Sequence, residues 1–134
     1  MIREYEERDL EVLQRIHAES GFGYAFPNLS DPLFISKLIL AGADGRPAMA
    51  SLARLTCESY FLIDRSDVGL SPRQRYENLL ELQRAGEGDL LRKGLEDAHA
   101  WLPPSIARRF GRRLETLGWV RDDTWTPYCR RLRD

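Results

Sequence analysis

The 134-residue sequence predicts an α/β fold of the α+β type, in which helices flank a mixed and mostly antiparallel central sheet. Apolar residues recur at helical spacing near both ends and after the middle of the chain, whereas residues 38–64 form extended runs separated by turn residues. A chain of this length buries roughly two thirds of its unfolded surface, so we expect one domain over residues 1–134.

The N-terminal part begins with a short expected strand, residues 1–5, and continues into a helix over residues 9–20 with Asp9 as its N-cap. The residues on one stripe of this helix are Leu10, Leu13, Ile16 and His17. A partly buried, hydrogen-bonded imidazole is favoured for His17 over a catalytic one, because no Ser, Cys or Asp motif accompanies it.

A loop over residues 21–30 carries three aromatic residues, Phe22, Tyr24 and Phe26. These rings either line a ligand pocket or pack over the end of the core. The Ser-Asp-Pro sequence that follows is typical of a helix start, and it predicts a short second helix over residues 32–38.

Three antiparallel strands are expected next, over residues 38–43, 46–55 and 58–64. The Asp44-Gly45 pair between the first two predicts a type I′ turn, in which both central residues have positive φ. Short turns of this kind make the meander local in sequence.

A long helix is expected over residues 72–93, with Ser71 as N-cap and Pro72 at its first position. Gly94 is expected to end it, although Gly86 and Gly88 weaken its middle. A strand over residues 97–104 should follow.

The last helix is expected within "SIARRFGRRLETLGWV", where Ile106, Phe110, Leu114 and Leu117 form one apolar stripe and Gly118 ends it. Two strands forming a hairpin, residues 119–123 and 124–132, should complete the chain.

Composition limits the classes of function. The formal net charge of −1 argues against a uniformly charged surface, and Cys57 and Cys129 lack metal-ligand spacing, so no metal site is expected. The charged N-terminus lacks the apolar run of a signal peptide, and no later run is long enough to span a bilayer. A cytoplasmic protein without membrane contact is therefore expected.

The order of the expected elements, together with "IREYEERDLEVLQRI" at the start and "FGRRLETLGWV" near the end, resembles the GNAT superfamily of acyl-CoA-dependent N-acyltransferases. The first stretch is similar to the family's "IR...D...L...I" pattern, and "LETLGWV" is similar to its "YEKLGF" ending. The likeness extends over nearly the whole chain as an order of elements. It implies acetyl-CoA or another acyl-CoA as cofactor, and a small-molecule or peptide amine as acceptor.

In this family the acyl-CoA arm pairs with backbone where the fourth strand parts from the strand after the long helix. The resemblance implies "YFLID", with Leu62, Ile63 and Asp64, as the cofactor-facing strand and "HAWLP" as its neighbour. The pyrophosphate would lie at the start of the long helix, where N–H groups and the helix dipole attract anions. The residues implied there are Gly69, Ser71, Arg73 and Arg75.

Two features depart from the family pattern. Its Gln/Arg-x-x-Gly-x-Gly/Ala phosphate loop is replaced by "RSDVGLSPRQR", with Gly69 alone, and its helix tyrosine is replaced by Leu114. Glu58 is the first choice for a general base and Tyr128 for the acid, although an exposed glutamate and an edge tyrosine are the simpler interpretations. The alternative is a GNAT-like binding module that has lost acyl-CoA.

A third class of function would use the basic side chains of the last helix and the tail to bind nucleic acid. These residues are Arg108, Arg109, Arg112, Arg113, Arg130, Arg131 and Arg133. A solvated helix face is favoured instead, because Glu115, Asp122 and Asp123 interrupt the patch. The sequence is compatible with a homodimer.

Overall fold

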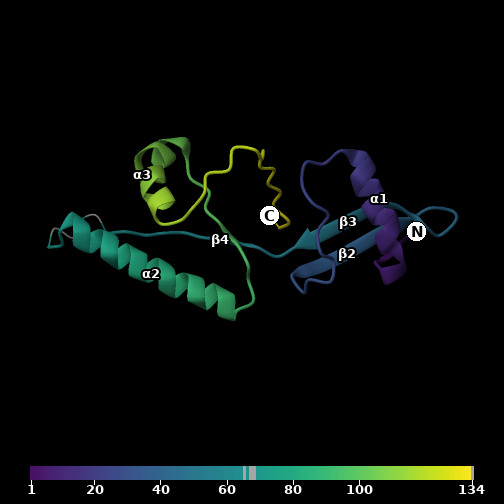
Figure 1. The fold of residues 1–134 in the computed structure, drawn as a ribbon, viewed down its shortest axis with the longest axis horizontal. Helices are drawn as coiled ribbons and strands as arrows, with labels where there is room; N and C mark the ends of the chain where they lie inside the picture. Colours follow the sequence, from purple (N-terminus) through teal and green to yellow (C-terminus); the bar gives the residue numbers. More distant parts are fainter. Residues whose placement is uncertain (65, 67–68, 134) are drawn as a thin grey trace. The chain divides into compact units, whose positions relative to one another are not determined.

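The computed structural model describes residues 1–64, 66 and 69–133, which form three α-helices, a three-stranded antiparallel sheet and a two-stranded parallel sheet (Figure 1). The mixed α/β class predicted from the sequence is therefore confirmed. The chain divides into two compact units, one of Met1–Glu58 with Glu87–His99 and one of Ser59–Gly86 with Ala100–Asp134. The GNAT-like details of the fold and the single domain stay predictions.

The first unit is built on the strands β1 (Ile2–Glu4), β2 (Phe34–Ala41) and β3 (Pro47–Arg54), which lie in that order. The short 3₁₀ turn η1 (Glu7–Asp9) leads into helix α1 (Leu10–Ser20), which lies beside this sheet in Figure 1. The core between helix and sheet consists of Leu13, Leu29 and Ile39, with Tyr5, Leu10, Ile16, Phe26, Phe34 and Leu52 packed against it. The predicted apolar stripe of α1 is thus confirmed.

The turn between β2 and β3 differs from the predicted type I′ turn. Gly45 has a φ of 79°, but no non-glycine residue in the described part of the chain has positive φ, so Asp44 is not in the left-handed region. The amide of Gly42 donates to the carbonyl of Arg46, and the amide of Gly45 donates to the carbonyl of Gly42. The hairpin is confirmed, with one glycine rather than two residues supplying the left-handed conformation.

The helix predicted over residues 32–38 is wrong, because β2 occupies most of this segment. The side chain of Asp31 accepts a hydrogen bond from the amide of Leu33, and its carbonyl accepts one from Phe34. These bonds close a turn instead of starting a helix. Pairing with β3, from Phe34 onward, then supplies hydrogen bonds that outweigh a weak local helix signal.

Asp9 lies at the predicted N-cap position of α1, but its side chain has a different role. Its side chain makes no capping hydrogen bond to α1; instead its oxygens accept bonds of 2.7 and 2.8 Å from the two terminal nitrogens of Arg3. Asp9 is 2% exposed, and it also accepts the amide of Glu6. Hydrogen bonds from Arg3 lower the pKa of Asp9 to about 2. This ion pair joins β1 to the start of α1.

The strands predicted over residues 58–64 and 97–104 are mostly wrong. Their regular parts are only β4 (Cys57–Glu58) and β5 (Ala98–His99), which pair in parallel as a separate sheet. The expected continuous central sheet is therefore replaced by two sheets. Two register pairs give few ladder bonds, so side chains must hold this small sheet together.

The long helix α2 (Pro72–Arg92) and the last helix α3 (Pro104–Thr116) lie where the sequence predicts them. Gly94 and Gly118 have φ values of 88° and 94° and follow the two helices. The amide of Trp119 donates to the carbonyl of Leu114, as in a Schellman motif. Both predicted glycine stops are confirmed.

The second unit is held by a polar contact between α2 and the end of α3. Gln83 is 6% exposed; its amide donates to the carbonyl of Leu117 at 2.7 Å, and its oxygen accepts the indole N–H of Trp119 at 3.0 Å. Phe61 packs edge-on against Trp119, with ring centroids 6.2 Å apart. Leu114 and Leu117 are buried at the same helix end.

The predicted C-terminal hairpin is wrong, because the described residues after Gly118 form no strand. Asp122 accepts hydrogen bonds from Thr124, and Arg121 pairs with Asp123. These contacts join residues close in sequence, so they form turns and not the backbone hydrogen bonds of a β-hairpin.

Candidate functional site

The implied base, Glu58, is the last residue of β4, and its side chain is exposed. Its register partner in β5 is His99. Paired residues on neighbouring strands project to the same face of a sheet, so a carboxylate and an imidazole lie next to each other here. A carboxylate and an imidazole are both side chains that can accept and pass on a proton.

A salt-bridge cluster next to this pair holds β4 and β5 together. Arg54 donates to Glu96 at 2.8 Å and to Asp97 at 3.1 Å, and it lies 3.9 Å from Asp31. Thr56 donates to the side chain of Asp97 at 2.8 Å. Residues more than 40 positions apart in the sequence are thereby joined just before the two short strands.

These contacts shift the pKa values of both partners towards the charged forms. The hydrogen bond from Thr56, assisted by Arg54, holds the pKa of Asp97 below its ordinary value. The bond to Glu96 raises the pKa of Arg54. The charged forms of Arg54 and Asp97 are therefore favoured, and their contact holds β4, which ends at Glu58, next to β5.

The implied phosphate site begins at the first turn of α2. Ser71 Oγ accepts the amide of Gln74 at 3.2 Å, and the amide of Ser71 donates to the side chain of Gln74 at 2.9 Å. This reciprocal capping confirms the predicted helix start. The capping bond uses the backbone N–H of Gln74, and Pro72 has no backbone N–H. The backbone at this helix end therefore offers few hydrogen-bond donors to a phosphate.

The two arginines in the first turn supply charge at the same place. Arg73 is exposed and pairs with Glu77 at 3.0 Å, four residues further along α2. Arg75 is also exposed, and its amide donates to the carbonyl of Ser71. Guanidinium groups bind phosphate well. The exposed ion pair of Arg73 with Glu77 is weak, so a phosphate could replace Glu77 as the partner of Arg73 at little cost in free energy.

The implied cofactor-facing segment is not a strand. Leu62 and Ile63 are 92% and 51% exposed. Asp64 accepts hydrogen bonds from the hydroxyl and the amide of Ser66, which lower its pKa. Gly69, which is exposed, lies beyond this local turn.

The implied acid, Tyr128, lies in the irregular tail and is 94% exposed. Leu114, which occupies the position of the family's tyrosine, is buried with 7% exposure. A buried leucine cannot donate a proton, so α3 offers no substitute for the tyrosine at that position.

The predicted site residues fall into both units. Glu58 belongs to the first unit, whereas the remaining predicted residues belong to the second. Within the second unit the first turn of α2 brings Ser71, Arg73 and Arg75 together along one helix end.

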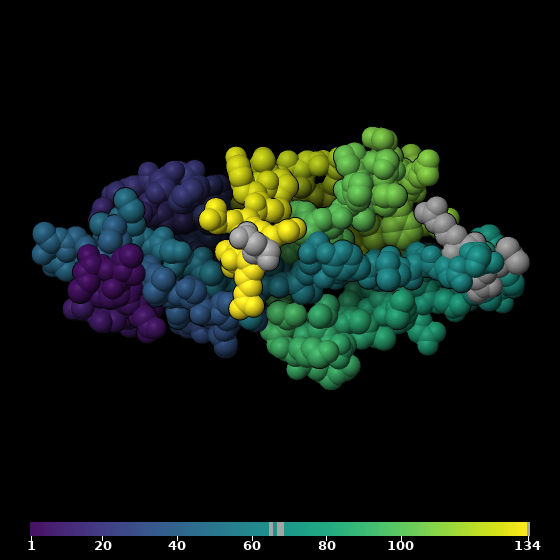
Figure 2. All heavy atoms as spheres, turned by 180° about the vertical axis from the view of Figure 1, so that it is seen from behind, coloured from purple at the N-terminus to yellow at the C-terminus, as the bar shows by residue number. Residues whose placement is uncertain are grey.

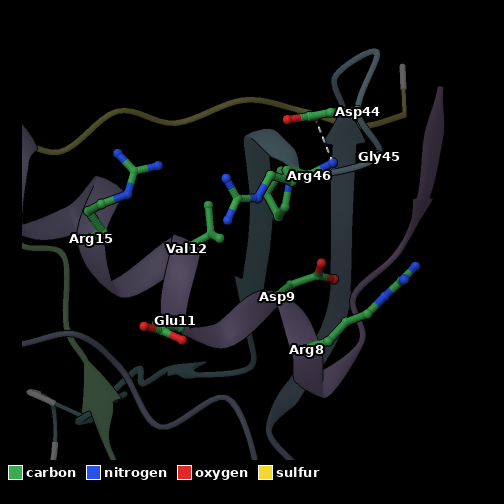
Figure 3. A pocket seen from close by; sticks show the side chains of 9 residues that line it. Arg8, Asp9, Glu11, Val12, Arg15, Asp44, Gly45 and Arg46 are labelled. Atoms are coloured by element: carbon green, nitrogen blue, oxygen red, sulfur yellow. Dashed lines mark hydrogen bonds between the residues drawn. The ribbon is translucent and has the colours of Figure 1, made fainter.

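A surface hollow of about 460 Å³ lies elsewhere in the first unit (Figure 3). It lies between α1 and the β2–β3 turn, and Figure 3 shows Arg15 and Arg46 on either side of Val12. The residues that line it are Arg8, Asp9, Glu11, Val12, Arg15, Asp44, Gly45, Arg46 and Pro47. Its three arginines and three carboxylates balance, so its charge favours neither anions nor cations.

The aromatic loop packs around His17. The rings of Phe22, Tyr24 and Phe26 have centroids 5.5, 5.2 and 5.5 Å from the imidazole. Of these rings, Phe26 packs against the core, as one of the two expectations has it, whereas Phe22 and Tyr24 are 54% and 44% exposed. His17 Nε2 is buried and has no hydrogen-bond partner among the described residues, which corrects the predicted hydrogen-bonded imidazole.

Sequence reasoning missed His99 as the neighbour of Glu58, and it missed the Arg54 cluster. The expected strand over residues 97–104 contained His99, but only the register pairs it with Glu58. The acidic pair Glu96-Asp97 before a short strand was the available signal for a basic partner.

Comparison of the chain with protein-family models, with curated proteins and with solved structures gave no match. In the described part of the chain, no helix combines the length and apolar character needed to cross a membrane. Among the same residues, no group of three or more His, Cys, Asp or Glu side chains is placed to hold a metal ion.

Proposed function

We propose that this protein binds acyl-CoA and transfers the acyl group to an amine, as a divergent GNAT-like N-acyltransferase. The observation that carries the proposal is the parallel β4–β5 pair, which comprises two register pairs and flanks the long helix α2 in sequence. The family resemblance implies two strands that part from each other on either side of a long helix, and a pairing limited to two residues supports such an arrangement.

The donor set at the start of α2 fits a pyrophosphate by charge rather than by a backbone cradle. Arg73 and Arg75 would bind the phosphate oxygens, with the positive end of a 21-residue helix adding to their field. An acyl thioester bound there supplies an activated carbonyl carbon.

Glu58 would accept the proton of the attacking amine, with His99 beside it to stabilise the carboxylate or relay the proton. The amine nitrogen bonds to the carbonyl carbon, the carbon–sulfur bond breaks, and the departing thiolate takes a proton. The resemblance gives that last role to an acid, for which Tyr128 remains the candidate. Alignment of the two reactants accounts for much of the rate in such a transfer.

Binding and chemistry can be tested separately. At acetyl-CoA concentrations about 100 times its Kd, the free energy of unfolding should rise by about 2.7 kcal/mol. The double variant R73Q/R75Q should lose this effect, whereas R92Q, which changes an exposed arginine at the far end of α2, should keep it. An unchanged melting temperature with acetyl-CoA and with longer acyl-CoA esters would refute the proposal.

Catalysis is measured by release of free CoA thiol with a panel of primary amines. E58Q should lower the rate about 10²- to 10⁴-fold while leaving the affinity for acetyl-CoA unchanged, because a general base acts only on the chemical step.

The buried Leu114 at the position of the family's tyrosine favours a second function, a binding module without transfer activity. Acyl-CoA binding without thiol release from any amine would support a module that retains the cofactor. If no acyl-CoA binds at all, the module would be one that has lost it.

A further inference from the structure

We propose that α3 and the C-terminal tail form a binding surface for single-stranded nucleic acid, a function beyond the acyl transfer proposed above, with Tyr128 as the one residue that both proposals use. The polar face of α3 carries four arginines: Arg108, Arg109, Arg112 and Arg113. At 3.6 residues per turn they lie within an arc of about 140° and along about 7.5 Å of the helix.

The arginines of α3, like Arg46 and Arg84, form no ion pair within the described part of the chain. Ion pairs between described residues are formed by Arg3, Arg8, Arg15, Arg54, Arg73, Arg92 and Arg121. Within the same residues, none of the four arginines on α3 forms one, and all four are exposed.

Among the described residues, none of the acidic residues that interrupt this patch in the sequence, Glu115, Asp122 and Asp123, forms an ion pair with an arginine of α3. Asp123 pairs with Arg121, and Asp122 accepts the amide and hydroxyl of Thr124. Residues 104–134 contain eight arginines and four acidic side chains, whereas the whole chain has a net charge of −1. Positive charge is thus concentrated at this end of the sequence, which the total conceals.

The tail adds side chains on which bases can stack. Trp125 is 59% exposed and Tyr128 is 94% exposed, and Arg130, Arg131 and Arg133 follow them. In Figure 2 the tail is the yellow segment at the surface. Basic side chains that track phosphates, combined with exposed aromatic rings, are the elements of sequence-tolerant single-strand binding.

An anionic membrane is a poorer partner for this helix. An amphipathic helix binds a bilayer by inserting its apolar face. The apolar side of α3 already packs within its own unit, where Leu114 and Leu117 are each 7% exposed and the Leu117 carbonyl is bonded by Gln83. Ile106, at the start of this apolar side, is 37% exposed, so the charged face is the larger surface left for a partner. Guanidinium groups match phosphate in geometry as well as charge.

The test uses the full-length chain and a fluorescein-labelled oligonucleotide of mixed sequence, about 20 nucleotides long, as single strand and as duplex. Four phosphate contacts predict about a 50-fold loss of single-strand affinity between about 50 and about 200 mM salt. R108Q/R109Q/R112Q/R113Q should abolish most of this salt dependence, and glutamine preserves helix propensity. The matched control R8Q/R15Q/R92Q/K93Q removes the same formal charge from ion-paired sites and should bind like the wild type.

W125L should weaken single-strand binding about fivefold or more and leave duplex binding unchanged, because stacking requires unpaired bases. Circular dichroism establishes that each variant remains folded. Three results would overturn the proposal: equal losses in the two quadruple variants, duplex bound as tightly as single strand, or binding only to vesicles that contain anionic lipid.

Discussion

The two units of this protein are stabilised by different kinds of contact. The first has an apolar core of Leu13, Leu29 and Ile39 between helix and sheet. The second depends on a buried glutamine that joins α2 to the end of α3. The comparison teaches that a periodic apolar pattern accounts for the core of the first unit, whereas the second unit adds a long-range polar contact to the few leucines that it buries.

The difference can be followed with two spectroscopic signals. All three tryptophans, Trp101, Trp119 and Trp125, belong to the second unit, so their fluorescence reports on that unit alone. Far-ultraviolet circular dichroism reports on helices and strands of both units.

The largest effect is expected from I39A, because Ile39 is fully buried in the apolar core. Removing its side-chain carbons should lower the free energy of unfolding by about 3 kcal/mol, measured by urea denaturation. I39V keeps the branched shape and should cost about 1 kcal/mol. Similar losses for the two variants would contradict the close packing inferred at this position.

D9N should have the next largest effect, about 2 kcal/mol, because it leaves the Arg3 guanidinium without its buried partner. The folded-state pKa of Asp9 is lowered to about 2 from an ordinary 3.8, so its contribution is present above pH 4 and is lost as the pH falls towards 2. Unfolding measured between pH 2 and pH 7 should show a steeper acid loss in the wild type than in D9N.

The control for this experiment is E11Q, which changes an exposed carboxylate at the start of α1. It should shift stability by only a few tenths of a kcal/mol and retain the acid transition of the wild type. Loss of that transition in E11Q would assign it to surface charge and not to the pair of Asp9 with Arg3.

Q83L should have the smallest of these effects, about 1 to 2 kcal/mol, because it leaves the Trp119 indole N–H and the Leu117 carbonyl without their partner. The change should appear in tryptophan fluorescence as an altered environment of Trp119. Q14L, at an exposed position of α1, should be nearly neutral. Equal stability of Q83L and the wild type would show that the second unit does not depend on this contact.

The parts of the fold predicted correctly are those with strong local signals. The stripe of α1, the capped start of α2 at Ser71 and the stops at Gly94 and Gly118 each follow from a few neighbouring residues. The β2–β3 hairpin was predictable for the same reason. Local propensity and tertiary contacts agree at these positions.

The errors lie where strands depend on distant partners. Residues 58–64 and 124–132 carry aromatic and branched residues typical of strands, but among the described residues they form little or no ladder. Strand propensity expresses packing against neighbours, which a single sequence does not specify. The short helix predicted over residues 32–38 failed because pairing with β3 outweighed the local signal.

The candidate site was predictable only in part. Ser71, Arg73 and Arg75 could be placed together because one helix start contains all three. His99 could not be predicted as the neighbour of Glu58, because the two residues are 41 positions apart and their pairing depends on the register of β4 with β5. The Arg54 cluster next to it was hidden for the same reason.

Helix α2 has a consequence for any attempt to dissect the molecule. Its residues 72–86 are assigned to one unit and its residues 87–92 to the other, and the backbone passes between units at three points, after Glu58, Gly86 and His99. No single cut of the chain therefore yields either half intact. A cut at the boundary after Gly86 would sever a continuous helix, so we expect the resulting fragments to be recovered unfolded.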